Sequence, residues 1–165
     1  MSRGNDIWRR AERGLDCNMS YVKGVLAINA GSAATVKTTN ALTYTVDGVQ
    51  YTKTALSAQA LTAYTGNTFY TQPASTTVYY VLGVNAAGTV YCFQGTYAGQ
   101  TQNPLRADFS VGDGSIPDVP DGVTPFGMIK VVTGATTFLP GTDALDKASV
   151  TFTFYDVAVL PSVAP

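Results

Sequence analysis

The sequence predicts a mainly β protein, an antiparallel β-sandwich or barrel of about eight short strands with a short N-terminal helix or arm. Three stretches carry this prediction. Val78 to Gln94 consists of two apolar runs around a turn, Asp47-Gly48 separates two alternating runs, and Val150 to Leu160 alternates along its length. Turn signals recur about every ten residues and long amphipathic helices are absent, which is typical of antiparallel β domains.

Length and charge predict one domain that packs against other molecules. A chain of 165 residues is ordinarily one domain with a sizeable core. Charged residues make up only 13% of it, against about a quarter in ordinary soluble proteins. A surface so poor in charge favours self-association. We expect residues 1–23 to form an N-terminal arm and residues 24–165 to form a single β domain.

The arm differs in composition from the rest. It holds five of the ten basic residues and Glu12, the only glutamate. Asn5 or Asp6 can cap a short helix from Ile7 to about Leu15. Tryptophan beside arginine is a common anchor of protein contacts, so the arm is a candidate docking segment. Its contact residues would be Ile7, Trp8, Arg9, Arg10 and Arg13. A frayed terminus, or Trp8 folded onto its own domain, is the alternative.

After the arm, the pattern becomes that of β-strands. Tyr21 to Asn29 predicts a strand, Gly31 to Ala34 a turn, and Thr35 to Thr39 a second extended piece. Asp47-Gly48 is the signature of a type I′ hairpin turn. Leu42, Tyr44 and Val46 would share its buried face, with threonines on a solvent face. Ser57 to Thr65 is expected to be a loop.

The central hairpin is the clearest local prediction. Val78 to Val84 and Thr89 to Phe93 flank Asn85-Ala86-Ala87-Gly88. The first strand has no polar face, so it requires cover on both sides, within the domain or from another subunit. The residues expected to make oligomer or sheet contacts are Tyr79, Tyr80, Val81 and Leu82 here, and Phe152 and Phe154 in the last strand.

The C-terminal half continues the β pattern. Leu105 to Gly122 would be the longest loop, with Phe126 to Val132 resuming the sheet. Phe138 to Thr142 predicts a turn. Val150 to Leu160 would be the last strand, with Phe152 and Phe154 on one face, ended by Pro161.

The inventory of reactive groups argues against an enzyme. The chain has no histidine, so the usual general base and most transition-metal sites are missing. A glycosidase pair would have to be built from aspartates. The spacing of Asp113, Asp118 and Asp121 does not match a calcium loop, so we expect turn-forming roles for them, and likewise for Asp143 and Asp146. Neither a metal nor another cofactor is expected.

Two cysteines are too few for a disulfide framework, so buried free thiols are expected at Cys17 and Cys92. The net charge of −1 argues against nucleic acid as a partner. No run of signal-peptide or membrane-span length is seen, so the protein is expected to be made in a cytoplasm and to have no membrane partner. Exposed tyrosines such as Tyr64, Tyr70 and Tyr97 could instead stack on sugars.

The C-terminal third resembles a known class of protein. Pro125 to Pro161 carries the motifs Gly127-x-Ile129-x-Val131, Phe138-x-Pro140-Gly141-Thr142 and Tyr155-Asp156-Val157-x-Val159-Leu160-Pro161, together with Leu145-Asp146. These motifs resemble virion structural proteins of tailed bacteriophages that decorate or cement the outside of the head. The likeness covers most of residues 33–161 and does not cover the first thirty.

The resemblance implies a β-rich structural protein on the outer surface of the virion capsid, made in the host cytoplasm. It would bridge subunits of the major capsid protein as a symmetric oligomer, often a homotrimer, with the arm gripping the capsid. The alternatives are a head-fibre, tail or adhesin module that binds a host-surface glycan, and a virion-associated glycanase that relies on aspartate.

Overall fold

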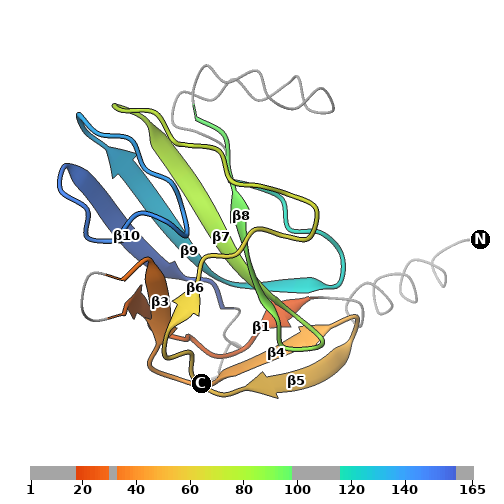
Figure 1. The fold of residues 1–165 in the computed structure, drawn as a ribbon. Helices are drawn as coiled ribbons and strands as arrows, with labels where there is room; N and C mark the ends of the chain where they lie inside the picture. The colour runs from red at the N-terminus through yellow and green to blue at the C-terminus, as the bar shows by residue number, and fades with distance from the viewer. Residues whose placement is uncertain (1–17, 30–32, 98–115, 159–165) are drawn as a thin grey trace, which may run out of the picture.

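The computed structural model describes residues 18–29, 33–97 and 116–158 and shows an all-β, antiparallel fold (Figure 1). These residues form no helix. The predicted helix from Ile7 to about Leu15 lies outside the described residues. The strands are β1 (Met19–Ser20), β2 (Leu26–Ile28), β3 (Thr35–Thr38), β4 (Leu42–Val46), β5 (Val49–Lys53), β6 (Gln59–Ala60), β7 (Thr77–Asn85), β8 (Val90–Gln94), β9 (Val123–Thr133) and β10 (Val150–Asp156).

The main sheet has four strands in the order β10-β9-β7-β8, all antiparallel. The predicted central hairpin is confirmed as β7 and β8. Asn85 Oδ1 accepts a hydrogen bond of 2.8 Å from the Thr89 N–H, and Gly88 takes a φ of 76°. A positive φ is easy for glycine, which has no Cβ. This turn therefore closes as its sequence predicts.

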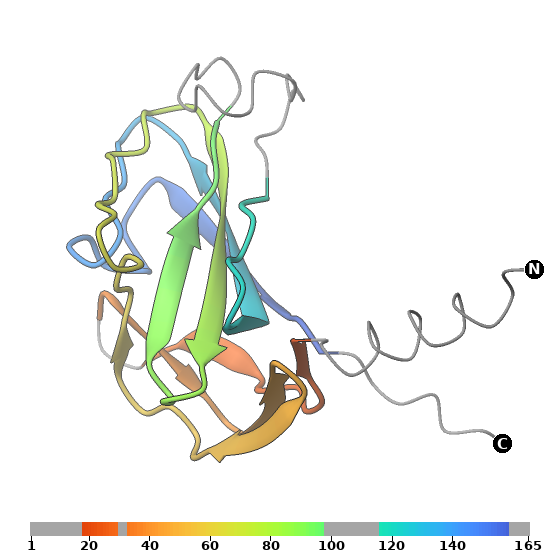
Figure 2. The same ribbon diagram turned by 90° about the vertical axis from the view of Figure 1, so that its right-hand side faces the viewer.

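Two three-stranded sheets complete the fold, in the orders β1-β4-β5 and β2-β3-β6. They lie at the end of the main sheet where the β7–β8 turn is found (Figures 1 and 2). The type I′ turn is confirmed, since both Asp47 and Gly48 have positive φ, 50° and 76°. The Tyr44 hydroxyl donates to the Asn85 carbonyl oxygen at 3.1 Å, which joins the two hairpins.

One core is shared by the three sheets. Its fully buried side chains include Val36 of β3, Leu42 of β4, Leu82 of β7 and Ile129 of β9. A second, smaller cluster of Val81, Phe93 and Val123 lies on the opposite, outer face of the main sheet. β7 is therefore covered on both faces within one chain, as its apolar sequence requires.

Several boundaries differ from the predictions. There are ten strands in place of about eight, because β1 and β6 have only two residues each and carry no sequence pattern. Tyr21 to Asn29 is not one strand, since Val25 takes a φ of 54° and only β2 pairs. Met19 and Ser20 pair with Thr45 and Tyr44, so strand pairing begins within the segment expected to be the arm.

Other differences follow from tertiary contacts. β6 lies inside the predicted Ser57 to Thr65 loop, and β9 starts at Val123, three residues before the predicted strand. Thr45, predicted on a solvent face, is buried because β1 and the Thr124 hydroxyl, which donates to the Thr45 carbonyl, cover it. In the described ranges no helix is long and apolar enough to cross a membrane.

Candidate functional site

The predicted contact residues do not form one surface. Tyr80 and Leu82 are fully buried in the shared core and Val81 lies in the outer cluster, so these three are sheet contacts within the chain. Tyr79 is half-buried on the outer face. Phe152 and Phe154 are half-buried on the inner face of β10. The arm residues Ile7, Trp8, Arg9, Arg10 and Arg13 lie outside the described residues.

Tyr80 is held by a buried polar network. Its hydroxyl donates to Gln72 Oε1 at 3.0 Å, and burial raises its pKa well above the ordinary tyrosine value. Gln72 is itself fully buried, and its amide nitrogen donates to the carbonyls of Thr76 and Val131, both at 3.1 Å. This network satisfies buried polar groups and is structural. Nothing in the local sequence signals the burial of Gln72.

The register of the main sheet assembles an exposed strip that sequence reasoning did not single out. Tyr155 of β10 lies opposite Met128 of β9, which lies opposite Val81 of β7. Cross-strand partners and residues two apart share a face. The outer face over β9 and β10 therefore carries six side chains, which we call the β10 margin: Met128, Lys130, Val132, Thr151, Thr153 and Tyr155.

The two halves of this outer face differ in exposure. Over β7 and β8, Val81 and Phe93 are covered by neighbours that include Tyr64 and Val119, and residues 116–122 run along this side of the sheet (Figure 2). Over the β10 margin, Val132 is 37% and Tyr155 42% exposed. The alternating pattern of Val150 to Leu160 places Thr151 and Thr153 on this outer face, opposite Phe152 and Phe154.

The β10 margin carries a single charge, that of Lys130. The Lys130 ammonium lies over the ring of Tyr79, with Nζ 5.8 Å from the ring centroid. Such a cation–π contact is worth about 0.5–1 kcal/mol at an exposed site. The remaining margin side chains are apolar or hydroxyl groups. The arrangement can bind another protein surface through shape and hydrogen bonds.

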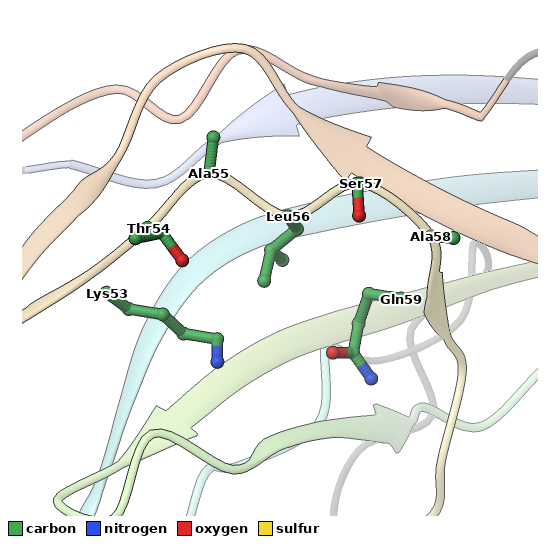
Figure 3. Close-up of a pocket in the computed structure, with 7 residues that line it drawn as sticks. All are labelled: Lys53, Thr54, Ala55, Leu56, Ser57, Ala58 and Gln59. Atoms are coloured by element: carbon green, nitrogen blue, oxygen red, sulfur yellow. The ribbon is translucent and has the colours of Figure 1, made fainter.

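The pocket in Figure 3 is a shallow depression of about 210 Å³ along consecutive residues 53–59. Lys53, Leu56 and Gln59 point toward the same side, and Leu56 is buried. No carboxylate or nucleophilic thiol lines this pocket, so it offers a lysine and an amide to a ligand without a partner for acid–base chemistry.

Reactive groups elsewhere have structural surroundings. The described part of the chain holds no group of three or more metal-binding side chains. Asp143 Oδ2 accepts the Leu139 N–H at 2.7 Å, the turn role predicted for it. Cys92 is confirmed as a buried free thiol, and its burial raises its pKa. Cys17 lies outside the described residues.

The tyrosines considered for sugar binding are engaged with neighbouring groups. Tyr64 packs against Tyr91 and Phe93, with ring centroids 5.0 and 5.5 Å away. Tyr70 meets Tyr97 edge to face, and its hydroxyl donates to the Gly95 carbonyl. All three are half-buried, whereas the sequence predicted them exposed. They do not form a flat open platform of rings.

Comparison of the chain with protein-family models, with curated proteins and with solved structures finds no match.

Proposed function

We propose that this chain is a structural virion protein that decorates and cements the outer surface of a tailed-phage capsid, bridging subunits of the major capsid protein. The observation that carries the proposal is the resemblance of Pro125 to Pro161 to such proteins. This stretch supplies most of β9 and all of β10. The β10 margin lies within this stretch, and Tyr155 belongs both to the margin and to the motifs of the resemblance.

The physical character of the described surface is consistent with this role. The β10 margin is poor in charge and offers apolar and hydroxyl groups to a protein partner. A symmetric oligomer would hold several capsid subunits at once and gain avidity from modest contacts. Since it would bind the assembled shell and not the free subunits, it would stabilise the shell by mass action. The role requires no catalysis.

The proposal is tested by adding the purified full chain to phage heads that lack it. We expect the protein to sediment with the heads and to raise the temperature at which they rupture. A variant without residues 1–17 tests the arm. This truncation leaves β1, which pairs with β4, in place. It should remain folded by circular dichroism and fail to sediment with heads.

The outcomes separate the two parts of the proposal. If the full chain neither coats nor strengthens heads, the cement function is wrong. If the truncated chain coats heads as densely as the full chain, the arm assignment alone is wrong. Binding to host-surface polysaccharide without binding to heads would favour the adhesin alternative.

A further inference from the structure

The free edge of β10 points to an inference beyond the proposed function. The hydrogen-bonded pairing with β9 extends to the residues just before and just after β10. The Gly134 N–H donates to the Ser149 carbonyl at 2.7 Å, and the Val157 N–H donates to the Phe126 carbonyl at 3.0 Å. In an antiparallel pair, alternate residues bond to the same neighbour. The odd-numbered residues of β10 therefore bond to β9, and Phe152 and Phe154 direct their N–H and C=O groups away from it.

No other strand takes up these groups. β10 is the last strand of the main sheet, and the ribbon shows it at the sheet's margin (Figure 1). Within the described ranges, no hydrogen bond joins the backbone of Phe152 or Phe154 to anything beyond β9. Two aromatic residues thus present unpaired backbone donors and acceptors at the spacing of a β-ladder.

The edge also lacks the features that usually prevent pairing. Natural edge strands are often short, bulged, or protected by lysine or proline. β10 pairs with β9 over seven consecutive positions without a bulge, and Val150 to Tyr155 contains no charge, proline or glycine. The first charge is Asp156, whose carboxylate accepts the Leu26 N–H at 3.0 Å. A straight, neutral edge of this kind is complementary to another extended strand.

The pattern of β10 is complementary to itself. When two copies are placed antiparallel with Thr153 opposite Thr153, Phe152 lies opposite Phe154 of the second copy. These are the residues with free backbone groups, so each pair can exchange two hydrogen bonds. Their rings would meet on the inner face, while hydroxyl groups lie together on the outer face. No like charges face each other across this contact.

We propose that two copies of this chain pair antiparallel through β10, around a twofold axis at Thr153, and join their main sheets into one continuous sheet. A twofold contact of this kind uses the same patch on both copies. Among the edge strands of the two smaller sheets, β5 is less suited because it has only five residues and ends in Lys53, and β1, β2 and β6 have only two or three residues each. The proposal concerns association between copies and holds independently of whether the protein binds capsids.

Crosslinking tests the predicted register. Thr153 would face its equivalent in a pair without direct hydrogen bonds, where Cα atoms are about 4.5 Å apart and a disulfide can form. In a Cys17→Ser background, Thr153→Cys should therefore give a covalent dimer under mild oxidation. The matched control is Thr52→Cys, an exposed threonine of β5, which should stay uncrosslinked.

Mass measurement tests the contact itself. Light scattering should give the full chain a mass of twice 17.3 kDa. Thr153→Lys would place two ammonium groups near the axis and should weaken pairing at least about tenfold. Thr52→Lys should have no effect. Circular dichroism and thermal unfolding confirm that both lysine variants are folded.

Each outcome bears on the proposal. A covalent dimer specific to Thr153→Cys, with loss of the dimer in Thr153→Lys, supports it. A wild-type monomer at all concentrations would overturn it. A trimer or other oligomer that Thr153→Lys leaves intact would equally overturn it.

Discussion

The two edges of the main sheet are built differently although both are rich in apolar and aromatic residues. At β8, the Cys92 N–H donates to the Thr62 carbonyl at 2.7 Å. Gln94 forms two further bonds across this edge, accepting the Tyr70 N–H at 3.0 Å and donating to the Tyr70 carbonyl at 2.9 Å. At β10 the described residues make one comparable bond, from the Leu26 N–H to the Asp156 carboxylate at the end of the strand. The backbone of Phe152 and Phe154 has no such partner among them. One chain therefore closes the β8 edge with its own backbone and leaves the middle of the β10 edge free.

The difference concerns hydrogen bonding and not packing. The ring of Phe138 lies between Tyr80 of β7 and Phe152 of β10, with centroids 6.0 and 5.2 Å away. Phe138 is fully buried, so the inner side of the free edge is anchored in the same core as the closed one. Because β10 is already ordered, its unpaired edge can bind a partner without the entropy cost of first ordering the strand.

Replacing Phe138 with alanine should destabilise both edges of the main sheet together. We expect Phe138→Ala to lower the free energy of unfolding by about 3–5 kcal/mol, because it opens a cavity under both β7 and β10. Denaturant unfolding followed by circular dichroism measures the loss. Hydrogen exchange should show that amides of β8 and β10 lose protection together.

A matched control is Tyr155→Ala on the exposed outer face of β10. Removing this 42% exposed ring should change stability by about 1 kcal/mol or less. If Phe138→Ala instead speeds hydrogen exchange only at the β10 amides and leaves the β8 amides protected, β10 unfolds separately from the rest of the sheet. The two edges would then not be anchored in the same core.

Replacing Gln94 with alanine should open the closed edge. The change removes both bonds to Tyr70 and one to the Tyr80 hydroxyl, at a cost of about 1–2 kcal/mol. Cys92 reports on the result, because its thiol is buried and its raised pKa keeps it unreactive in the closed state. In a Cys17→Ser background, alkylation of Cys92 should become about tenfold faster.

Thr151→Ala on β10 provides the comparison for this experiment. It lies on the outer face of the opposite edge and should leave the alkylation rate of Cys92 unchanged. Equal rates for wild type and Gln94→Ala would show that the Gln94 amide does not hold the β8 edge closed.

The closed edge was only partly predictable from sequence. Asn85 to Gly88 and Asp47-Gly48 specify their turns through local backbone chemistry, so both hairpins were predicted correctly. The segment that covers β8 carries no such signal. Thr62 and Tyr70 reach β8 from more than twenty residues away in the chain. Contacts of this kind depend on tertiary packing, which overrides local pattern.

The exposed side of β10 was also only partly predictable, because its exposure depends on tertiary packing. Alternation correctly assigned Phe152 and Phe154 to one face of β10, as their shared burial shows. It could not show that β10 is an edge strand, because strand order is a property of the whole sheet. Tyr79 and Tyr80 look alike in the sequence, yet one is half-buried on the outer face and the other fully buried in the core.

The loop between β9 and β10 stabilises the open side of the main sheet through bonds of Asp143 and Lys147. Asp143 Oδ2 accepts the Leu139 N–H at 2.7 Å and the Lys147 ammonium at 3.0 Å. Lys147 also donates to the Thr137 carbonyl at 2.8 Å. These bonds brace the turn that carries Phe138 into the core beside Phe152. The bonds of Asp143 and Lys147 therefore help to hold the inner face of β10 against the core.

Acid should weaken the bonds that Asp143 makes with Leu139 and Lys147. Burial alone would raise the pKa of Asp143, but the bonds from Lys147 and Leu139 outweigh it and hold that pKa below the ordinary value. A carboxyl with a lowered folded pKa contributes stability above its unfolded pKa of about 4, and that contribution is lost as pH falls further. Asp143→Asn should therefore cost about 0.5 kcal/mol at neutral pH and flatten the decline in Tm below about pH 4. If the Tm of Asp143→Asn followed the same pH dependence as that of the wild type, the bonds of Asp143 would contribute nothing to stability.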